Sequence, residues 1–230
     1  VRFFLGKKID RIMKFSNAVI IGNEYLSSRA QLSGANRIEI VPSVVDLNKY
    51  KEVKINYNKE LVVGWIGSPS TGKYLLEIKS IFKLLKKEFD VRFVFVGCNK
   101  DTVKELPVEV CPWSEETEVQ LIKSFDIGIM PLKNSLWEKG KCGYKLIQYM
   151  ACGIPVVASP IGINTQIVQN GTNGFLAKDI IGWEVALRKL LTDESLRRKM
   201  GKNGRKRVEE EYSAQVQSKK LIKIINSLFT

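Results

Sequence analysis

The sequence of 230 residues contains no histidine, so the commonest general base of enzymes is missing from it. Nucleophiles that depend on a neighbouring histidine, such as Ser-His and Cys-His pairs, are therefore excluded within these residues. The four cysteines form no C-x-x-C pair, and no histidine is present to complete a zinc site. We expect no metal site and reduced cysteines, with a disulfide as the alternative. Carboxylates, lysines and backbone amides remain as the chemical equipment of the chain.

Long hydrophobic runs are missing as well. No stretch comes near the roughly 18 consecutive apolar residues that a membrane-spanning helix needs. The first five residues are followed by Lys7 and Lys8 rather than by the apolar segment of a signal peptide. We therefore expect a cytoplasmic protein. Because the sequence does not begin with methionine, we also expect it to be a fragment of a longer protein.

Negative charge is scarce relative to positive charge. The sequence has 37 lysines and arginines against 24 acidic residues, a formal net charge of +13, and much of the excess lies in residues 7–14 and 197–207. Such an excess favours anionic partners, namely nucleotide phosphates, nucleic acid or the inner face of an anionic membrane. The alternative is a solvated basic helix face. No aromatic RNA-binding motif or helix-turn-helix pattern accompanies the charge, so we expect no nucleic-acid partner.

Short apolar runs alternate with amphipathic stretches along most of the chain, which predicts an α/β fold with a Rossmann-like parallel sheet and helices on both faces. The apolar runs that we expect as strands are residues 18–21, 38–41, 61–66, 91–96, 108–111, 127–131, 156–158 and 175–177. Several of them are apolar throughout, as strands buried on both faces are. The main helices are expected at residues 74–89, 115–125, 144–152, 180–191, 194–210 and 214–228, with Asp193 and Ser213 as N-caps of the last two.

Residues 47–58 interrupt this pattern, because they are polar, rich in lysine and without apolar periodicity. We interpret them as a linker between domains. Residues 1–46 before the linker suffice only for helix–strand–helix–strand, so we expect them to be the tail of a preceding domain. Residues 59–212 then form the Rossmann-like domain, and residues 213–230 a C-terminal helix.

A first candidate site is the loop that follows the predicted strand at residues 61–66. Gly67, Ser68 and Gly72 are small enough for backbone amides to approach a phosphate, and Lys73 adds a full positive charge before the next helix. The loop is not a P-loop, since Tyr74 stands where serine or threonine must hold magnesium. An ordinary strand-to-helix turn is the alternative interpretation.

The second candidate site is more specific. Residues 140–159 read as a glycine loop, a helix, a tight turn at Gly153 and a buried strand, and a further glycine loop follows at Gly162. Two loops at the carboxyl ends of neighbouring parallel strands face one crevice, which is where open α/β sheets bind ligands.

This stretch resembles the C-terminal domain of the retaining nucleotide-sugar glycosyltransferases (glycosyl transferases group 1, GT-B fold), whose line runs K-x-x-E-Y-M-A-x-G-x-P-V-V-A-S-x-x-G and then x-x-G-x-N-G-F-L. The residues that match it are Lys145, Tyr149, Met150, Ala151, Gly153, Pro155–Ser159, Gly162, Gly171 and Asn173–Leu176. Pro42–Asp46 resembles the family's hinge motif P-N-G-V-D. Gly67 and Lys73 fall where the family has its donor phosphate loop, so the resemblance covers essentially the whole chain.

Three positions depart from the family's pattern. Ser68 replaces the usual phosphate-binding arginine, and Gln148 stands where the second glutamate of the E-x7-E motif binds the ribose hydroxyls. Gly140 occupies the position of the first glutamate, and Glu138 is the nearest carboxylate. Glu138 can contact the sugar hydroxyls if the loop is reshaped, and a solvated loop charge is the alternative. Gln148 retains a carbonyl acceptor but no charge.

The resemblance implies transfer of a sugar from UDP-sugar or GDP-sugar with retention at the anomeric carbon, without metal or cofactor. Catalysis would rest on cations and amides aimed at the leaving diphosphate, with Lys73 and Glu138 as catalytic candidates. The expected donor-binding residues are Gly67, Ser68, Lys73, Trp113, Gly140, Lys141, Gly143, Tyr144, Lys145 and Gln148. Trp113 lies where such enzymes hold the base, and a plain core aromatic is the alternative interpretation.

The acceptor is expected to be a glycan or lipid-linked glycan, bound by the N-terminal domain that the chain lacks. We therefore expect the isolated chain to bind a nucleoside diphosphate without transferring sugar. The alternative function is a non-catalytic nucleotide-sugar-binding subunit that needs a partner chain. A nucleotide-sugar epimerase of the same fold is disfavoured, because such a cleft needs several acids and usually histidine.

Overall fold

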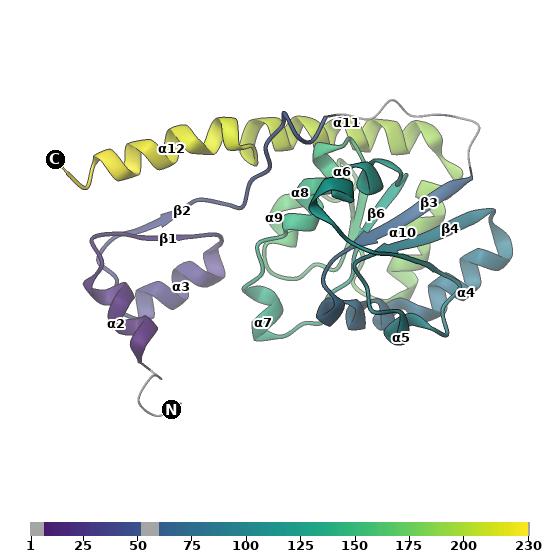
Figure 1. Ribbon diagram of the computed structural model, residues 1–230, viewed down its shortest axis with the longest axis horizontal. Helices are drawn as coiled ribbons and strands as arrows, with labels where there is room; N and C mark the ends of the chain where they lie inside the picture. Colours follow the sequence, from purple (N-terminus) through teal and green to yellow (C-terminus); the bar gives the residue numbers. More distant parts are fainter. Residues whose placement is uncertain (1–6, 52–59, 230) are drawn as a thin grey trace.

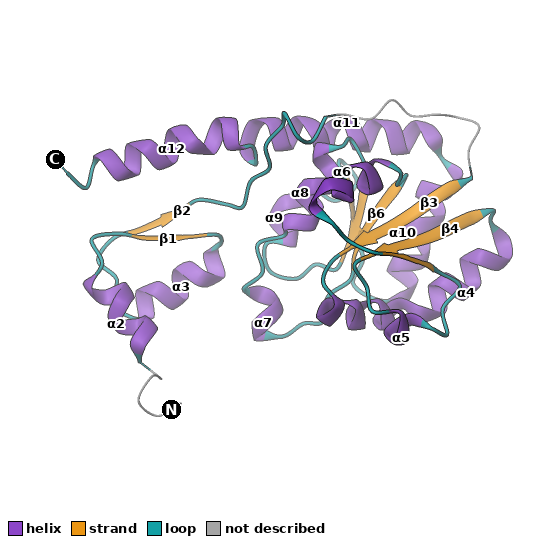
Figure 2. Ribbon diagram, viewed as in Figure 1, coloured by secondary structure: helices purple, strands orange, loops and turns teal. Residues whose placement is uncertain are grey.

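The computed structural model describes residues 7–51 and 60–229. A six-stranded sheet flanked by helices forms the larger part, and a smaller unit of two strands and two helices precedes it (Figures 1 and 2). The last helix, α12 (Ala214–Asn226), runs from the larger part toward the smaller one (Figure 1). Residues 52–58 of the predicted linker lie outside the described residues. No helix in the described ranges is long and apolar enough to cross a membrane.

The large sheet confirms the predicted α/β class. Its strands are β3 (Leu61–Ile66), β4 (Val91–Val96), β5 (Glu109–Cys111), β6 (Ile127–Met130), β7 (Val156–Ala158) and β8 (Gly174–Leu176). They lie in the order β5-β4-β3-β6-β7-β8, and every neighbouring pair is parallel. The chain winds outward from β3 to one side and from β6 to the other. The carboxyl ends of β3 and β6 therefore flank the switch point where such sheets bind ligands.

Both faces of the sheet are covered, which explains the continuously apolar strands. Side chains alternate along β3, so that Val62 and Ile66 join one core cluster while Val63 and Trp65 join the other. The helices of this part are α4 (Lys79–Glu88), α5 (Lys100–Val103), α6 (Glu115–Lys123), α7 (Leu136–Lys139), α8 (Tyr144–Ala151), α9 (Asn164–Ile167), α10 (Ile180–Thr192) and α11 (Glu194–Glu211). Residues of α6 and α8 pack in the first cluster, and residues of α4 and α10 in the second.

The single helix predicted at residues 74–89 is wrong in its first part. A 3-10 helix, η1 (Pro69–Ile78), comes first, and α4 begins only at Lys79. Gly72, Leu75 and Ile78 are all buried, and this spacing of three places them on one face of a 3-10 helix. Lys73 therefore lies inside η1 and not at the start of an α-helix.

The smaller unit has the predicted helix–strand–helix–strand order. It consists of α2 (Lys8–Phe15), β1 (Val19–Ile21), α3 (Glu24–Leu32) and β2 (Ile38–Ile40), with β1 and β2 paired in parallel. Asn23 caps α3 by accepting from Leu26 N–H, and its amide nitrogen donates to the carbonyl oxygens of Gly140 and Lys141 at 3.3 and 3.0 Å. One side chain therefore joins the smaller unit to the loop before α8.

The described part of the connection, up to residue 51, packs against the larger part. Val45 N–H donates to Tyr212 O, and Ala214 N–H donates to Val45 O, both inside a short parallel bridge. Tyr50, in the segment predicted as a polar linker, is only 2% exposed. Asp193 caps α11 as predicted, since its carboxylate accepts from Leu196 N–H. Ser213 precedes α12, but its hydroxyl donates to Glu209 O instead of capping the helix.

Candidate functional site

A pocket of about 670 Å³ opens at the carboxyl ends of the strands. The loops after β3, β4 and β5 and the first half of α8 supply its walls. The residues that line it are Ile66, Gly67, Ser68, Pro69, Gly97, Cys98, Trp113, Glu118, Tyr144, Lys145 and Gln148. Six of these were expected from the sequence, namely Gly67, Ser68, Trp113, Tyr144, Lys145 and Gln148. The structure therefore brings together most of the predicted donor-binding residues from three separate stretches of chain.

The loop after β3 does not offer its first amides to a ligand. Gly67 N–H donates to Val96 O at 3.0 Å, and Ser68 N–H donates to the Thr71 hydroxyl at 3.1 Å. Glycine is required at position 67 for packing, because a Cβ there would lie 2.5 Å from the Trp65 ring and 2.8 Å from Lys145 Nζ. Gly67 thus leaves room for a cation beside the end of β3.

Lys145 is the cation that lines the pocket. It lies in the first turn of α8, and its ammonium sits 4.8 Å from the centre of the Trp65 ring. Burial and, to a smaller extent, the charge of Lys141 lower the pKa of Lys145 to about 8. A lysine in these surroundings gains from an anion, because an anion restores the solvation that burial removed.

Helix α8 also presents its N-terminus here. Gly143 precedes it with φ +65°, and a Cβ at that position would lie 2.3 Å from Ile167 Cδ1, so the turn requires glycine. The first amides of an α-helix have no partner within the helix and carry partial positive charge. The start of α8 therefore adds to the positive potential around Lys145.

Lys73 and Lys141 form the rest of a lysine cluster, defined here as Lys73, Lys141 and Lys145. Both approach the ring of Tyr74, with Nζ at 5.5 Å for Lys73 and 4.6 Å for Lys141. Burial lowers the pKa of Lys141, the charge of Lys73 acts in the same direction, and Glu138 opposes the change. Lys73 is exposed, and neither of these two lysines is among the residues that line the pocket.

Glu138 is 6% exposed, so the interpretation as a solvated loop charge is wrong. Its carboxylate accepts hydrogen bonds from the hydroxyls of Ser135 and Tyr74. These two bonds hold the pKa of Glu138 below its ordinary value. The structure places Glu138 at the hydroxyl of Tyr74 and outside the pocket lining, where it joins α7 to η1.

Trp113 is 52% exposed, so the interpretation as a core aromatic is wrong. Its indole Nε1–H donates to Glu118 Oε2 at 2.8 Å. The Tyr50 hydroxyl donates to the other oxygen of Glu118 and accepts from Gln148 Nε2 at 2.7 Å. Gln148 itself is 3% exposed. One hydrogen-bonded chain thus connects the residue at position 148 with the exposed indole.

Tyr50 and Glu118 were missed from the sequence. Tyr50 stands in a polar, lysine-rich segment, and an aromatic residue there was the signal available. Glu118 follows two other glutamates in the first turns of α6, where acidic residues are common at helix N-termini. Nothing in that pattern separates the pocket-lining glutamate from its neighbours.

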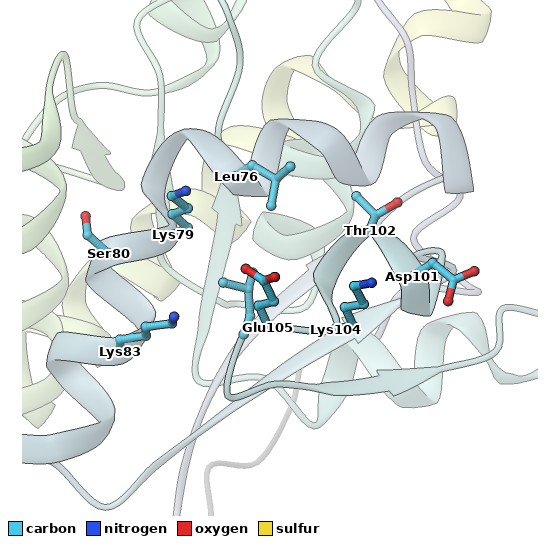
Figure 3. Close-up of a pocket in the computed structure, with 9 residues that line it drawn as sticks. Leu76, Lys79, Ser80, Lys83, Asp101, Thr102, Lys104 and Glu105 are labelled. Atoms are coloured by element: carbon cyan, nitrogen blue, oxygen red, sulfur yellow. The ribbon is translucent and has the colours of Figure 1, made fainter.

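A second pocket, of about 430 Å³, lies between α4 and residues 101–106 (Figure 3). Figure 3 shows the side chain of Lys83 extending from α4 toward the segment that carries Lys104 and Glu105. The lining of this second pocket contains lysines and the carboxylates of Asp101 and Glu105. None of the residues predicted from the sequence lines it, so we place the functional site in the larger pocket.

Four of the seven basic residues at 197–207 are paired with glutamates of the same helix. The ion pairs one turn apart on α11 are Arg198–Glu194, Arg205–Glu209, Lys206–Glu210 and Arg207–Glu211. Arg197 instead donates to the carbonyl oxygens of Leu190 and Leu191. These contacts support the solvated helix face over an anion-binding patch at this place.

Comparison with known proteins adds independent information. The sequence pattern of the family described as Glycosyl transferases group 1 matches residues 60–193. The chain is 27% identical over 194 residues to the capsular polysaccharide biosynthesis glycosyltransferase CapM of Staphylococcus aureus, covering 79% of this chain and 50% of CapM. It is 25% identical over 176 residues to the N-acetyl-alpha-D-glucosaminyl L-malate synthase of Bacillus anthracis. This match covers 72% of this chain and 45% of the synthase. The chain spans about half the length of these relatives.

Solved structures show the same architecture. Anabaena HepE in complex with UDP superposes with a TM-score of 0.80 at 18% identity, covering 98% of this chain and 68% of HepE. TarM superposes with a TM-score of 0.77 at 20% identity, covering 98% of this chain and 46% of TarM. At these identities the likeness shows the fold, which is that of the GT-B glycosyltransferases.

Proposed function

The chain belongs to the glycosyl transferases group 1 family, and from this membership we propose that it is the donor-binding half of a retaining glycosyltransferase. The donor would be a UDP-sugar or GDP-sugar, bound in the pocket at the carboxyl ends of the strands. The observation that carries the proposal is the meeting of Lys145, an exposed Trp113 and the start of α8 in one pocket. Cations and helix amides suit the phosphates, and an aromatic face suits the base.

The lysine cluster would do the main catalytic work. Transfer leaves a nucleoside diphosphate, whose developing charge must be stabilised by groups already in place. Lys145 and the first amides of α8 lie at the pocket, and Lys141 and Lys73 extend the positive potential along the Tyr74 ring. In this proposal Glu138 acts through Tyr74, because it accepts from the hydroxyl of the ring that both lysines approach. The Gly67–Ser68 amides play no direct part, because both have partners in the protein.

The acceptor would be a glycan or lipid-linked glycan, bound by a second domain. CapM, a relative of this chain, is named for capsular polysaccharide biosynthesis, which supports an acceptor of this kind. We further propose that the isolated chain binds nucleotide without transferring sugar. Peripheral contact with an anionic membrane stays a prediction, and the paired arginines of α11 give it no support.

The test is titration calorimetry of the chain against UDP, GDP and ADP, with the matching monophosphates as comparison. We expect at least one diphosphate to bind, and to bind more tightly than its monophosphate, since the second phosphate reaches the lysine cluster. Lys83→Ala, which changes a lysine of the second pocket, should bind like the wild type. Absence of heat from all three diphosphates at millimolar concentration would contradict the proposed donor site.

A further inference from the structure

The pocket contains one unexplained charge. Glu118 is the single carboxylate among the described residues that line it, although the proposed ligand is a polyanion. A carboxylate repels phosphates, so it is useful in such a pocket only where the ligand presents donors. On a nucleoside diphosphate, the hydroxyls of the ribose are the donors of this kind.

Glu118 stands at the end of the pocket that suits a nucleoside. It comes from α6, just after the loop that follows β5, the edge strand. Lys145 comes from α8, between β6 and β7, on the other side of the central strand β3. The topology thus brings Glu118 to the pocket from the β5 side of β3 and Lys145 from the β6 side, and we call these two sides the nucleoside end and the lysine end.

The Glu118 carboxylate is fixed by two hydrogen bonds and can still accept others. One oxygen accepts from the Tyr50 hydroxyl and the other from Trp113 Nε1–H. Each carboxylate oxygen has two acceptor sites, so both oxygens retain capacity for a further donor. Because Trp113 is bonded to Glu118 through its ring edge, an aromatic face and an acceptor have a fixed relation in the pocket wall.

Position 148 cannot supply the charge that Glu118 supplies. Gln148 is neutral, and its amide nitrogen is engaged by the Tyr50 hydroxyl at 2.7 Å. Tyr50 in turn donates to Glu118. The hydrogen bonds therefore run from Gln148 through Tyr50 to Glu118, where the negative charge of this network lies.

We infer that Glu118 is the carboxylate that recognises the ribose hydroxyls of the donor nucleotide, with Trp113 beside it for the base. This inference rests on the proposed donor site. The family pattern around residue 148 would place the contact with the ribose hydroxyls on α8. The inference places this contact on α6 instead. Gln148 and Tyr50 then serve to hold the carboxylate in position.

The test compares Glu118→Gln with the wild-type chain on two ligands. The first is whichever of UDP, GDP and ADP the wild type binds most tightly, and the second is its 2′,3′-dideoxy counterpart. A charge-assisted hydrogen bond exceeds a neutral one enough to change affinity by about fivefold to tenfold. We expect Glu118→Gln to lose about that factor for the ribonucleotide and less than twofold for the dideoxynucleotide.

Because each protein is compared on both ligands, a shift of Trp113 or a loss of stability affects both affinities and leaves their ratio unchanged. Lys145→Met serves as the control, and it should weaken both ligands by the same factor because both carry the same diphosphate. An equal loss on both ligands in Glu118→Gln would show that Glu118 acts only through Trp113. A wild type that binds without preferring ribose would overturn the inference alone, whereas no binding of any diphosphate would overturn the proposed donor site.

Discussion

The two ends of the pocket are built in opposite ways. At the lysine end, Lys145 lines the pocket while Lys73 and Lys141 lie outside its lining near the Tyr74 ring, and burial lowers the pKa of Lys141 and Lys145. At the nucleoside end, the polar groups of the Trp113, Glu118, Tyr50 and Gln148 network already bond one another. The first end gains stability from a ligand, while the second is already ordered without one and keeps free acceptor capacity on Glu118. Affinity should therefore depend mainly on the lysine end, and discrimination between ligands on the nucleoside end.

The largest effect is expected from Lys145→Met, which removes the charge at the pocket and keeps most of the side-chain packing. A hydrogen bond to a charged group contributes about 1.5–3 kcal/mol, so affinity for the nucleoside diphosphate should fall roughly tenfold to a hundredfold. The melting temperature should not fall, because a partly buried charge is removed. Calorimetry and thermal unfolding measure the two quantities. An unchanged affinity would place the phosphates away from Lys145.

Trp113→Ala should have the next largest effect. Stacking of a base on an aromatic side chain is worth about 1–3 kcal/mol, so binding should weaken around tenfold. The loss should be similar for the diphosphate and the monophosphate of one nucleoside, since both carry the same base. A loss confined to the diphosphate would mean that the indole contacts phosphate and not base.

Gln148→Glu tests whether the hydrogen-bond network of the nucleoside end needs a donor at position 148. The new carboxylate cannot donate to Tyr50 Oη, so the buried hydrogen bond between residues 148 and 50 is lost. The carboxylate would also lie near the charge of Glu118. We expect destabilisation of about 1–3 kcal/mol and no tighter nucleotide binding. Urea unfolding checks the first part and calorimetry the second. Tighter binding at unchanged stability would instead return the ribose contact to position 148.

Lys73→Ala should have the smallest effect on binding. Lys73 is exposed and outside the pocket lining, and exposed charge pairs are worth about 0.2–1 kcal/mol. The expected loss of diphosphate affinity is therefore about twofold to fivefold, and added salt should diminish it further. A loss as large as that of Lys145→Met would show that η1 moves onto the ligand.

The sequence predicted the sheet better than the site. Continuous apolar runs such as Leu61–Ile66 located every strand of the large sheet to within about two residues, because burial on both faces leaves a plain pattern. Gly67 and Lys145, which the sequence singled out, line the same pocket in the structure. The burial of Glu138 could not be predicted, because its partners, Tyr74 and Ser135, meet it only in the folded chain. For Trp113 the core alternative stayed open, because an aromatic residue after a strand is equally compatible with core and surface; the structure exposes it at the pocket.

Stability and binding should respond to pH in opposite directions at Lys145. Its folded pKa of about 8 lies below the ordinary value of 10.5, so between these values the unfolded chain binds more protons. Stability should therefore rise with pH in this window relative to Lys145→Met. Affinity for the diphosphate should fall over the same window, because the ammonium is lost.

The most direct test of the central claim, that the diphosphate binds at Lys145, is the number of protons taken up on binding at pH 8. An anion beside the ammonium raises its pKa, so binding should draw a fraction of a proton from the buffer. Calorimetric titrations in two buffers of different ionisation enthalpy measure that fraction. The account predicts proton uptake by the wild type with the nucleoside diphosphate, and much less with Lys145→Met or with the nucleoside alone. Diphosphate binding without proton uptake, or with the same uptake in Lys145→Met, would contradict it.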